Sequence, residues 1–325
     1  MLKMRSAAFS QARPPDIATE TPGAAVIKNP QDLTQAVLAV MQQTPDARLR
    51  DIMVSLVTHL HGFVKEVKLT EDEFRTATAL LARMGQMTND HHNEVVLMAG
   101  SLGVSSLVCL LNNGQSGQFE ITQNLLGPFW RLNSPPTANG ASILRSPTPG
   151  TPMYVQARVL DVAGLPIASA EVNVWHCAPS GFYENQVDAR AEGQADMNLR
   201  GKFTTGAQGE FSFWCVKPIG YPIPVNGVVG QMLMAQKRHP MRPAHVHALI
   251  HKPGYKTLIS QVYASDDPNL ATDVQFGVTE AVTGHFKLHE VPPADHPDMS
   301  SPWVSLDFTF RMEPGESRLP RAPIK

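Results

Sequence analysis

The chain has 325 residues, of which 42% are hydrophobic and 17% are charged, a balance typical of a folded globular protein. Its formal net charge of −2 gives no electrostatic reason to expect a nucleic acid or an anionic membrane as partner. The three cysteines (Cys109, Cys177 and Cys215) form no Cys-x-x-Cys pair, so they indicate neither a disulfide framework nor a zinc ribbon. Because the N-terminus lacks the apolar core of a signal peptide and no stretch approaches ~18 continuous apolar residues, we expect a cytoplasmic protein.

The first part of the chain is predicted to be helical. Residues 1–28 are rich in Pro, Ala and polar residues without periodicity, and we expect a flexible arm. Over residues 29–118 apolar side chains recur at helical spacing, which predicts a domain of four helices. The second of these begins at Pro45, a Thr70–Glu73 capping box begins the third, and the fourth runs from about Asn89 to Leu111.

The second part of the chain has the pattern of β-strands. Segments over residues 150–325 alternate apolar and polar side chains and are separated by Gly and Pro at short intervals. Strands that follow helices, without alternating with them, indicate an α+β protein: an N-terminal helical domain and then an antiparallel β-sandwich. Residues 119–149 are expected to link the two domains.

The clearest local signal for chemistry is the pair His245 and His247 in Arg242-Pro243-Ala244-His245-Val246-His247. In a strand, residues two apart point to the same face, so two imidazoles lie side by side as metal ligands would. On spacing alone, two surface histidines are an equally good interpretation. His59 and His61 have the same spacing, but they fall in a helical pattern where side chains two apart diverge by roughly 200°.

Two of the five tyrosines, Tyr183 and Tyr221, lie in turns bounded by Gly and Pro. A phenolate is a hard, strongly donating anion that suits Fe(III) better than Fe(II), Zn(II) or Cu(I). For either tyrosine alone, a half-buried residue with a satisfied hydroxyl is the simpler interpretation. Tyr154, Tyr255 and Tyr263 receive that interpretation.

A set of motifs favours the metal-ligand interpretation of these residues. Taken together, the motifs make the sequence resemble the intradiol ring-cleavage dioxygenases, and within that family the hydroxyquinol 1,2-dioxygenase branch. The resemblance spans nearly the whole chain beyond the arm, and each motif alone is weak. The motifs are Leu126-Gly127-Pro128-Phe129, Val174-Trp175-His176, Gly181-Phe182-Tyr183, Asn198-Leu199-Arg200-Gly201, Gly220-Tyr221-Pro222, the segment 242–247, and Ser305-Leu306-Asp307.

The resemblance implies an iron site. Tyr183, Tyr221, His245 and His247 would be the four protein ligands of one Fe(III) per chain. Tyr221 would be the tyrosinate that leaves when substrate binds and takes up a substrate proton.

The resemblance also implies a substrate pocket. Arg242 would stabilise negative charge that develops on the ring, and Gln261 would orient a ligand. We expect Trp175 to belong to the core of the sandwich. The flat apolar wall of the pocket would come from Leu125, Leu126, Gly127, Pro128, Phe129, Ile223 and Pro224, together with Arg242.

The implied reaction is opening of an aromatic ring between adjacent hydroxyls by O₂, most simply hydroxyquinol (benzene-1,2,4-triol) to maleylacetate. Cys109 and Gln275 depart from what hydroxyquinol-type relatives show, so catechol or a chlorocatechol, giving cis,cis-muconates, stays open. The helical domain would form a homodimer and could enclose a phospholipid. Two other classes also stay open: a non-catalytic transthyretin-like binding module, and a zinc or Fe(II) enzyme that uses only the two histidines.

Overall fold

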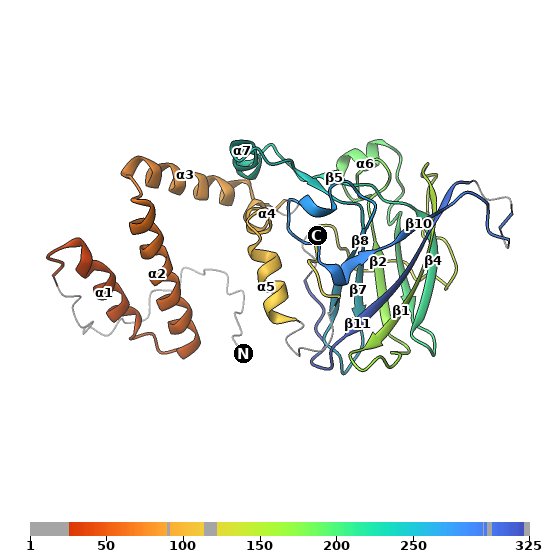
Figure 1. Ribbon diagram of the computed structural model, residues 1–325, viewed down its shortest axis with the longest axis horizontal. Helices are drawn as coiled ribbons and strands as arrows, with labels where there is room; N and C mark the ends of the chain where they lie inside the picture. The colour runs from red at the N-terminus through yellow and green to blue at the C-terminus, as the bar shows by residue number, and fades with distance from the viewer. Residues whose placement is uncertain (1–25, 90–91, 114–121, 295, 298–300, 322–325) are drawn as a thin grey trace. The chain divides into compact units, whose positions relative to one another are not determined.

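The computed structural model describes residues 26–89, 92–113, 122–294, 296–297 and 301–321. The chain divides into two compact units, and the division falls between Ala79 and Leu80 (Figure 1). The domain boundaries expected at residues 28, 118 and 149 stay predictions, and most of the arm and the segment 114–121 lie outside the described residues.

Helices make up the described part of the first unit. The second helix begins two residues after the predicted Pro45, because the side chain of Asp46 caps it by accepting a hydrogen bond from a backbone N–H in its first turn. The capping box is present as predicted: Thr70 N–H donates to the Glu73 carboxylate (2.9 Å), and Glu73 N–H donates to the Thr70 hydroxyl (3.3 Å). The helices are α1 (Pro30–Met41), α2 (Ala47–Val67) and α3 (Glu71–Met87), of which α3 crosses the division between the units.

The single helix predicted from about Asn89 to Leu111 is in fact two helices, α4 (Glu94–Ser101) and α5 (Val104–Asn112). The break occurs at Gly103, whose φ of 73° lies in the left-handed region that glycine adopts without strain. The axes of the two helices differ by 75°. Among the described residues no single helix is long and apolar enough to cross a membrane, although this bent pair meets the test of length and composition when it is joined.

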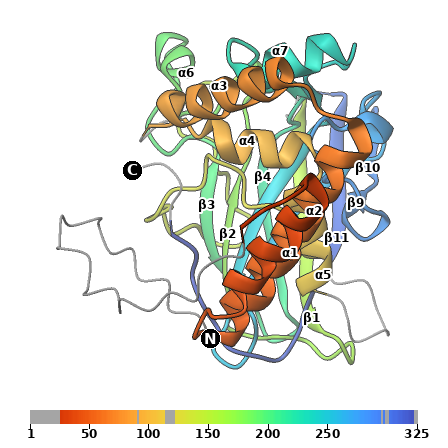
Figure 2. The same ribbon diagram turned by 90° about the vertical axis from the view of Figure 1, so that its left-hand side faces the viewer.

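Two sheets lie face to face in the second unit (Figures 1 and 2). One has the strand order β10-β11-β1-β4, and the other has the order β3-β2-β7-β8-β9. A short ribbon, β5 with β6, stands apart from both. The strands are β1 (Pro152–Asp161), β2 (Glu171–Trp175), β3 (Arg200–Thr204), β4 (Glu210–Val216), β5 (Tyr221–Pro222), β6 (Met241–Arg242), β7 (His245–His251), β8 (Leu258–Ala264), β9 (Thr283–Gly284), β10 (Phe286–His289) and β11 (Trp303–Met312). The helical elements between them are α6 (Val187–Ala191), α7 (Val228–Ala235), and the 3₁₀ turns η1 (Leu270–Thr272) and η2 (Glu280–Val282).

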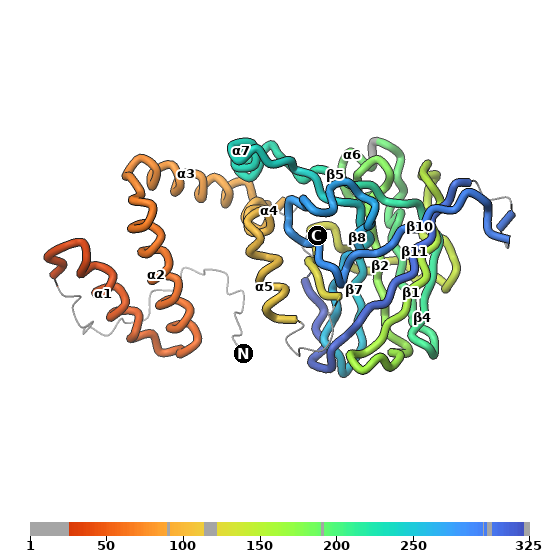
Figure 3. Tube along the Cα trace, in the orientation of Figure 1, coloured from red at the N-terminus to blue at the C-terminus, as the bar shows by residue number. Residues whose placement is uncertain are grey.

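The predicted α+β architecture is confirmed, and most neighbouring strands are antiparallel. Two pairs differ from the antiparallel expectation. β1 and β11 run parallel from Met153 opposite Val304 to Asp161 opposite Met312, and β8 and β9 also run parallel. Figure 3 traces how β1 and β11, far apart in the sequence, lie side by side. The last long strand therefore completes the interior of a sheet that the first strand began.

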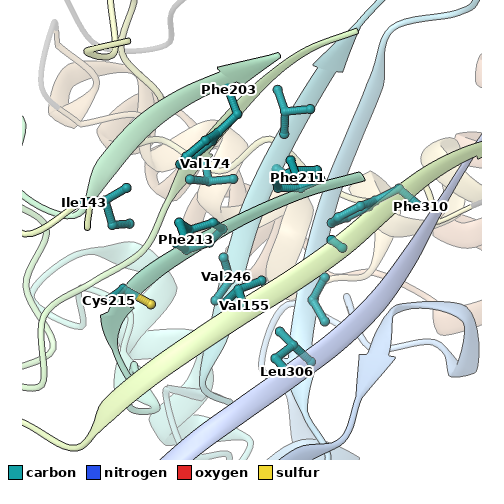
Figure 4. Close-up of a cluster of buried hydrophobic side chains, with 14 of the residues drawn as sticks. Ile143, Val155, Val174, Phe203, Phe211, Phe213, Cys215, Val246, Leu306 and Phe310 are labelled. Atoms are coloured by element: carbon teal, nitrogen blue, oxygen red, sulfur yellow. The ribbon is translucent and has the colours of Figure 1, made fainter. Parts of the chain in front are cut away.

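The core of the sandwich is formed by alternate side chains of the facing strands. On β1 and β4 every second residue is buried, as the alternation of a half-buried strand predicts. Phenylalanines stack through the centre: the rings of Phe203 and Phe213 are 5.3 Å apart, and those of Phe211 and Phe310 are 6.1 Å apart (Figure 4). The faces of β2, β7 and β8 that point away from this core can carry a functional site.

A buried ion pair fastens the loop after β2 to the edge strand β3. The Arg200 guanidinium donates to the Glu184 carboxylate (2.7 Å), and each side chain is only 1% exposed. Arg131, which is partly exposed, donates to the other carboxylate oxygen (2.6 Å). A buried charge is tolerated only with a partner, so the carboxylate of Glu184 has to stay beside Arg200. Because Tyr183 immediately precedes Glu184, the ion pair also fixes the backbone at Tyr183.

We expect Glu184→Gln to lower the free energy of unfolding by about 3–5 kcal/mol, because it leaves the buried charge of Arg200 uncompensated. Urea denaturation followed by circular dichroism measures this change. The matched control is Glu316→Gln, which removes a carboxylate from an exposed pair with Arg318 and should leave the denaturation midpoint unchanged. Equal midpoints for the two variants would show that the buried pair contributes nothing to stability.

Candidate metal centre and active site

Strand β7 carries the two histidines on its face away from the sandwich core. Val246 and Ala248 pack into that core, so the alternation of the strand directs His245 and His247 to the opposite face. Both histidines are 1% exposed. The same-face arrangement predicted from their spacing is present.

Two loops bring the tyrosines to the same place. Tyr183 follows Gly181, whose φ is 87° and at which an added Cβ would lie 3.4 Å from the Cβ of Tyr221. The turn therefore needs glycine both for its conformation and for this close approach. Tyr221 forms β5 and pairs with Arg242 of β6, three residues before the first histidine. Both tyrosines are buried.

Four donor atoms converge at this point. The Tyr183 hydroxyl lies 3.2 Å from the Tyr221 hydroxyl, 3.4 Å from His245 Nε2 and 3.2 Å from His247 Nε2. The Tyr221 hydroxyl lies 3.4 Å from His245 Nε2. Such separations are those of donor atoms that share one metal ion at about 2.0–2.2 Å.

The environment of these groups also fits a cation. Burial, and then the proximity of Tyr221, raises the pKa of the Tyr183 hydroxyl well above its usual value. Burial lowers the pKa of His245 to about 3 and holds that of His247 well below its usual value, so both imidazoles are neutral, as a metal ligand must be. A bound cation would stabilise the ionised form of the phenols. In the part of the chain that the structure describes, no group of three or more His, Cys, Asp or Glu is placed to hold a metal.

A second polar network lies beside the four donors and contains the two remaining candidate catalytic residues. Arg242 is buried and forms an ion pair with Asp273, with its Nε 3.2 Å from a carboxylate oxygen. A second guanidinium nitrogen of Arg242 donates to the Tyr263 hydroxyl. That hydroxyl donates to Oε1 of Gln261 (2.8 Å). The structure thus connects Arg242 to Gln261 through the Tyr263 hydroxyl, and it adds Asp273 as a second partner of Arg242.

The segment before β1 forms one wall of the site. The Leu125 carbonyl accepts a hydrogen bond from Gln261 Nε2. Gly127 has a φ of 70°, and a Cβ there would lie 3.0 Å from the His247 ring, so the backbone passes directly against that ligand candidate. Leu126 packs on the cluster of buried aromatic residues that contains both tyrosines.

The other expected pocket residues differ in their positions. The Phe129 ring stacks on the ring of Tyr183, with centroids 4.3 Å apart. Ile223 is buried in a separate apolar cluster with residues of α7. Pro128 and Pro224 are exposed. The structure therefore brings Leu125, Leu126, Gly127 and Phe129 to the site more directly than the other three.

The expectation that Trp175 belongs to the core of the sandwich is wrong. Its ring stacks on His247, with centroids 4.6 Å apart and an angle of 8° between the planes. The reason is strand parity: Val172 and Val174 face the core, so the residue after Val174 faces the site. Trp175 therefore supports the ring of His247, one of the four candidate ligands.

Two functional candidates were not recognised in the sequence. Tyr263, expected to be half-buried, is fully buried and lies opposite His245 in the pairing of β8 with β7. The pairing of Gln-x-Tyr with His-x-His across two strands is the signal that could have revealed it. His176 is also buried, its Nδ1 lies 2.8 Å from the Cys177 carbonyl, and burial lowers its pKa to about 4.

The two positions that depart from the expected pocket are in different surroundings. Gln275 is buried and donates to the Ser101 hydroxyl (2.9 Å), and its backbone N–H donates to Asp273. It therefore belongs to the surroundings of Arg242. The Cys109 side chain lies 4.0 Å from the Asn113 side-chain amide, and no contact with the site is recorded for it among the described residues.

Comparison with known proteins agrees with this geometry. Residues 126–311 match the family model described as Dioxygenase, and residues 46–118 match the model described as Catechol dioxygenase N terminus. The chain is 38% identical over 280 residues to a hydroxyquinol 1,2-dioxygenase of Rhizobium sp. (strain MTP-10005), covering 85% of this chain and 92% of the relative. It is 34% identical over 258 residues to a catechol 1,2-dioxygenase of Candida albicans, covering 79% and 84%.

A solved structure shows the same fold. The hydroxyquinol 1,2-dioxygenase of Pseudomonas putida DLL-E4 superposes with a TM-score of 0.78 and 33% identity, covering 87% of this chain and 98% of that one. The matched region includes every residue of the candidate site from Leu126 to Gly277. The helices and the sandwich thus both have counterparts in ring-cleaving enzymes, and the chain belongs to the intradiol ring-cleavage dioxygenase family.

Proposed function

We propose that Tyr183, Tyr221, His245 and His247 hold one Fe(III), and that the enzyme opens hydroxyquinol between its adjacent hydroxyls to give maleylacetate. The observation that carries the proposal is a buried set of two phenol oxygens and two imidazole nitrogens, in which the Tyr183 hydroxyl lies 3.2–3.4 Å from each of the other three atoms. Two phenolates together with two neutral imidazoles are a donor set suited to a hard trivalent ion. Bound Fe(III) supplies Lewis acidity and a template that holds the ionised diol for reaction with O₂.

The residues of the chain supply the proton acceptor and the charge. A diol binds as a dianion only after losing protons, and the Tyr221 phenolate oxygen is placed to take one of them. Its neighbour Arg242, which is buried and holds its proton firmly, puts a positive charge at the edge of the site. That charge favours negative charge on the bound ring, as fixed cations do in water-poor sites.

The apolar surfaces of the site hold the ring and exclude water. Phe129 and Tyr183 stack at one side, and Trp175 supports His247 from beneath. Gln261 fixes the wall segment by donating to the Leu125 carbonyl. A flat cavity wall with a few convergent polar groups is the usual form of a small aromatic binding site.

The choice of hydroxyquinol is supported by the names of the relatives in Rhizobium and Pseudomonas putida. The second candidate is catechol or a chlorocatechol, cleaved to cis,cis-muconates, which the Candida albicans relative favours. Membership of the family argues against the transthyretin-like binding module. The four-donor set argues against a zinc or Fe(II) site built on two histidines.

Three further features belong to the proposal. The thiols of Cys109, Cys177 and Cys215 are free, which agrees with the reducing cytoplasm. Exposed apolar side chains on α5, among them Leu107 and Leu111, agree with a homodimer formed through the helical region. A phospholipid held by the helices stays a prediction from the family resemblance.

We expect Tyr183→Phe and His245→Ala each to lower the bound iron severalfold or more, together with the visible charge-transfer absorption that tyrosinate gives to Fe(III). Each change removes one donor atom from the buried set. Metal analysis and absorption spectroscopy of the purified proteins measure both quantities. The control is Tyr255→Phe, which removes a hydroxyl outside the site. Full iron content and colour in both site variants would refute the ligand assignment.

Tyr221→Phe should separate proton transfer from metal binding. We expect it to retain part of its iron, because three donors remain, while kcat falls by about 10²- to 10⁴-fold through loss of the base. Oxygen consumption per bound iron measures kcat independently of loading. A normal rate per iron would remove Tyr221 from the mechanism.

The substrate is tested with the wild-type enzyme. The coloured protein is titrated without oxygen with hydroxyquinol, catechol and 4-chlorocatechol, and the products are identified by mass spectrometry once oxygen is admitted. We expect kcat/KM to be highest for hydroxyquinol, with maleylacetate as product. A higher value for catechol would establish the second candidate, and cleavage outside the two hydroxyls would overturn the proposal.

A further inference from the structure

We infer that Asp273 and Tyr263 are positioning residues of this site, which hold the Arg242 guanidinium and the Gln261 amide in one fixed arrangement. The inference rests on the proposed function, since it concerns how the ring-cleavage site is aligned. Neither Asp273 nor Tyr263 is one of the four donors. Both act through the residues that they hold.

Asp273 binds the Arg242 guanidinium from one side through both of its carboxylate oxygens. Its two carboxylate oxygens accept from Nε (3.2 Å) and Nη2 (3.3 Å) of Arg242, a two-point contact that fixes the plane of the guanidinium. The carboxylate is itself held by the backbone N–H groups of Gln275 (3.2 Å) and Gly277 (2.8 Å). The arginine and the aspartate side chains are only 6% and 2% exposed, so the anchor is rigid and dry.

Tyr263 binds the same guanidinium from another direction and also orients the Gln261 amide. Its hydroxyl accepts from Arg242 Nη2 and donates to Gln261 Oε1 (2.8 Å). Because one end of the Gln261 amide is thereby occupied as an acceptor, its nitrogen is directed to the Leu125 carbonyl. A single buried chain of contacts runs from Asp273 to the wall of the pocket.

The backbone at Gly277 leaves room for the Tyr263, Asp273 and Arg242 side chains. At Gly277, an added Cβ would lie 2.4 Å from the Tyr263 hydroxyl, 3.1 Å from Asp273 Oδ2 and 3.2 Å from Arg242 Nη2. Any side chain there would displace the three groups. The Gly277 carbonyl is fixed in turn by the Asn124 side chain (2.6 Å). The three polar groups and the glycine form one tightly fitted unit.

This unit explains how two catalytic side chains from different strands keep a common alignment. Arg242 lies on β6 and Gln261 on β8, and no direct hydrogen bond between them is recorded in the described part of the chain. The Tyr263 hydroxyl joins them, and Asp273 prevents the guanidinium from turning away. A displacement of about 1 Å in such a group can cost about 10²-fold in rate.

The first test is Tyr263→Phe, which removes one oxygen and keeps the ring. We expect iron content and visible absorption of the substrate-free enzyme to match the wild type, while kcat falls about 10²-fold and KM changes much less. The control is Tyr154→Phe, on the outer face of the other sheet, where the same atom is removed far from Arg242. We expect Tyr154→Phe to keep the wild-type rate.

The second test is a double-mutant cycle of Asp273→Asn with Arg242→Ala. If Asp273 acts through the guanidinium, adding Asp273→Asn to Arg242→Ala leaves kcat within about twofold, because the group being positioned is already absent. Asp273→Asn alone should lower kcat at unchanged iron content. Multiplicative losses in the cycle would overturn the inference.

The outcomes separate the inference from the proposed function. If the wild type binds iron and cleaves a diol but Tyr263→Phe behaves like Tyr154→Phe, the positioning role is wrong and the function stands. If Tyr263→Phe loses iron and stability together with its rate, Tyr263 is a structural residue and the inference also fails. If the wild type itself cleaves no diol, the proposed function has failed first.

Discussion

The site depends on one electrostatic constraint: two phenols and two imidazoles are buried together, with the Tyr183 hydroxyl 3.2–3.4 Å from each of the other three donor atoms. Without a cation, burial opposes ionisation of the phenols and protonation of the imidazoles alike, as the direction of every pKa shift in the group shows. Such a cluster contributes little to folding by itself, since buried polar groups must be compensated. Its position is maintained by what surrounds it: the Glu184–Arg200 pair behind one tyrosine, the β5–β6 ribbon at the other, and strand β7 for both histidines.

The sandwich brings these groups together because alternate residues of each strand point to the same face. One face of β7 packs into the core, and the other presents His245 and His247. Across the ladder, Gln261 stands opposite His247 and Tyr263 opposite His245. The four polar side chains therefore share one face because each strand alternates. The same parity places Trp175 of β2 against the His247 ring.

Much of this could be predicted from the sequence, for reasons that differ from residue to residue. The same-face histidines and the Thr70–Glu73 cap are local patterns, and local physics suffices for them. Tyr183 lies in a loop and Tyr221 in the two-residue strand β5, so no periodicity leads to them; only the resemblance of the whole chain to a family did. The expectation for Trp175 fails because the alternation of β2 puts Val174 on the core face and the next residue on the opposite face.

Other features had no local signal. The break at Gly103 depends on a left-handed backbone within an otherwise continuous apolar pattern. Asp273 lies about thirty residues from Arg242 in the sequence, and only the folded chain brings the carboxylate to the guanidinium. The parallel pairing of β1 with β11 is similarly a property of the topology, and an alternating pattern does not distinguish it from antiparallel pairing.

That pairing has a consequence for biosynthesis. β11 lies between β10 and β1 and occupies the inside of its sheet, so β1 has only one of its two neighbours until the ribosome has made residues 303–312. Contacts that join such distant segments form late and slowly. The nascent chain must therefore leave one edge of β1 unpaired until residues 303–312 have been made, and the core between the two sheets lacks the side chains of Val304, Leu306 and Phe310 until then.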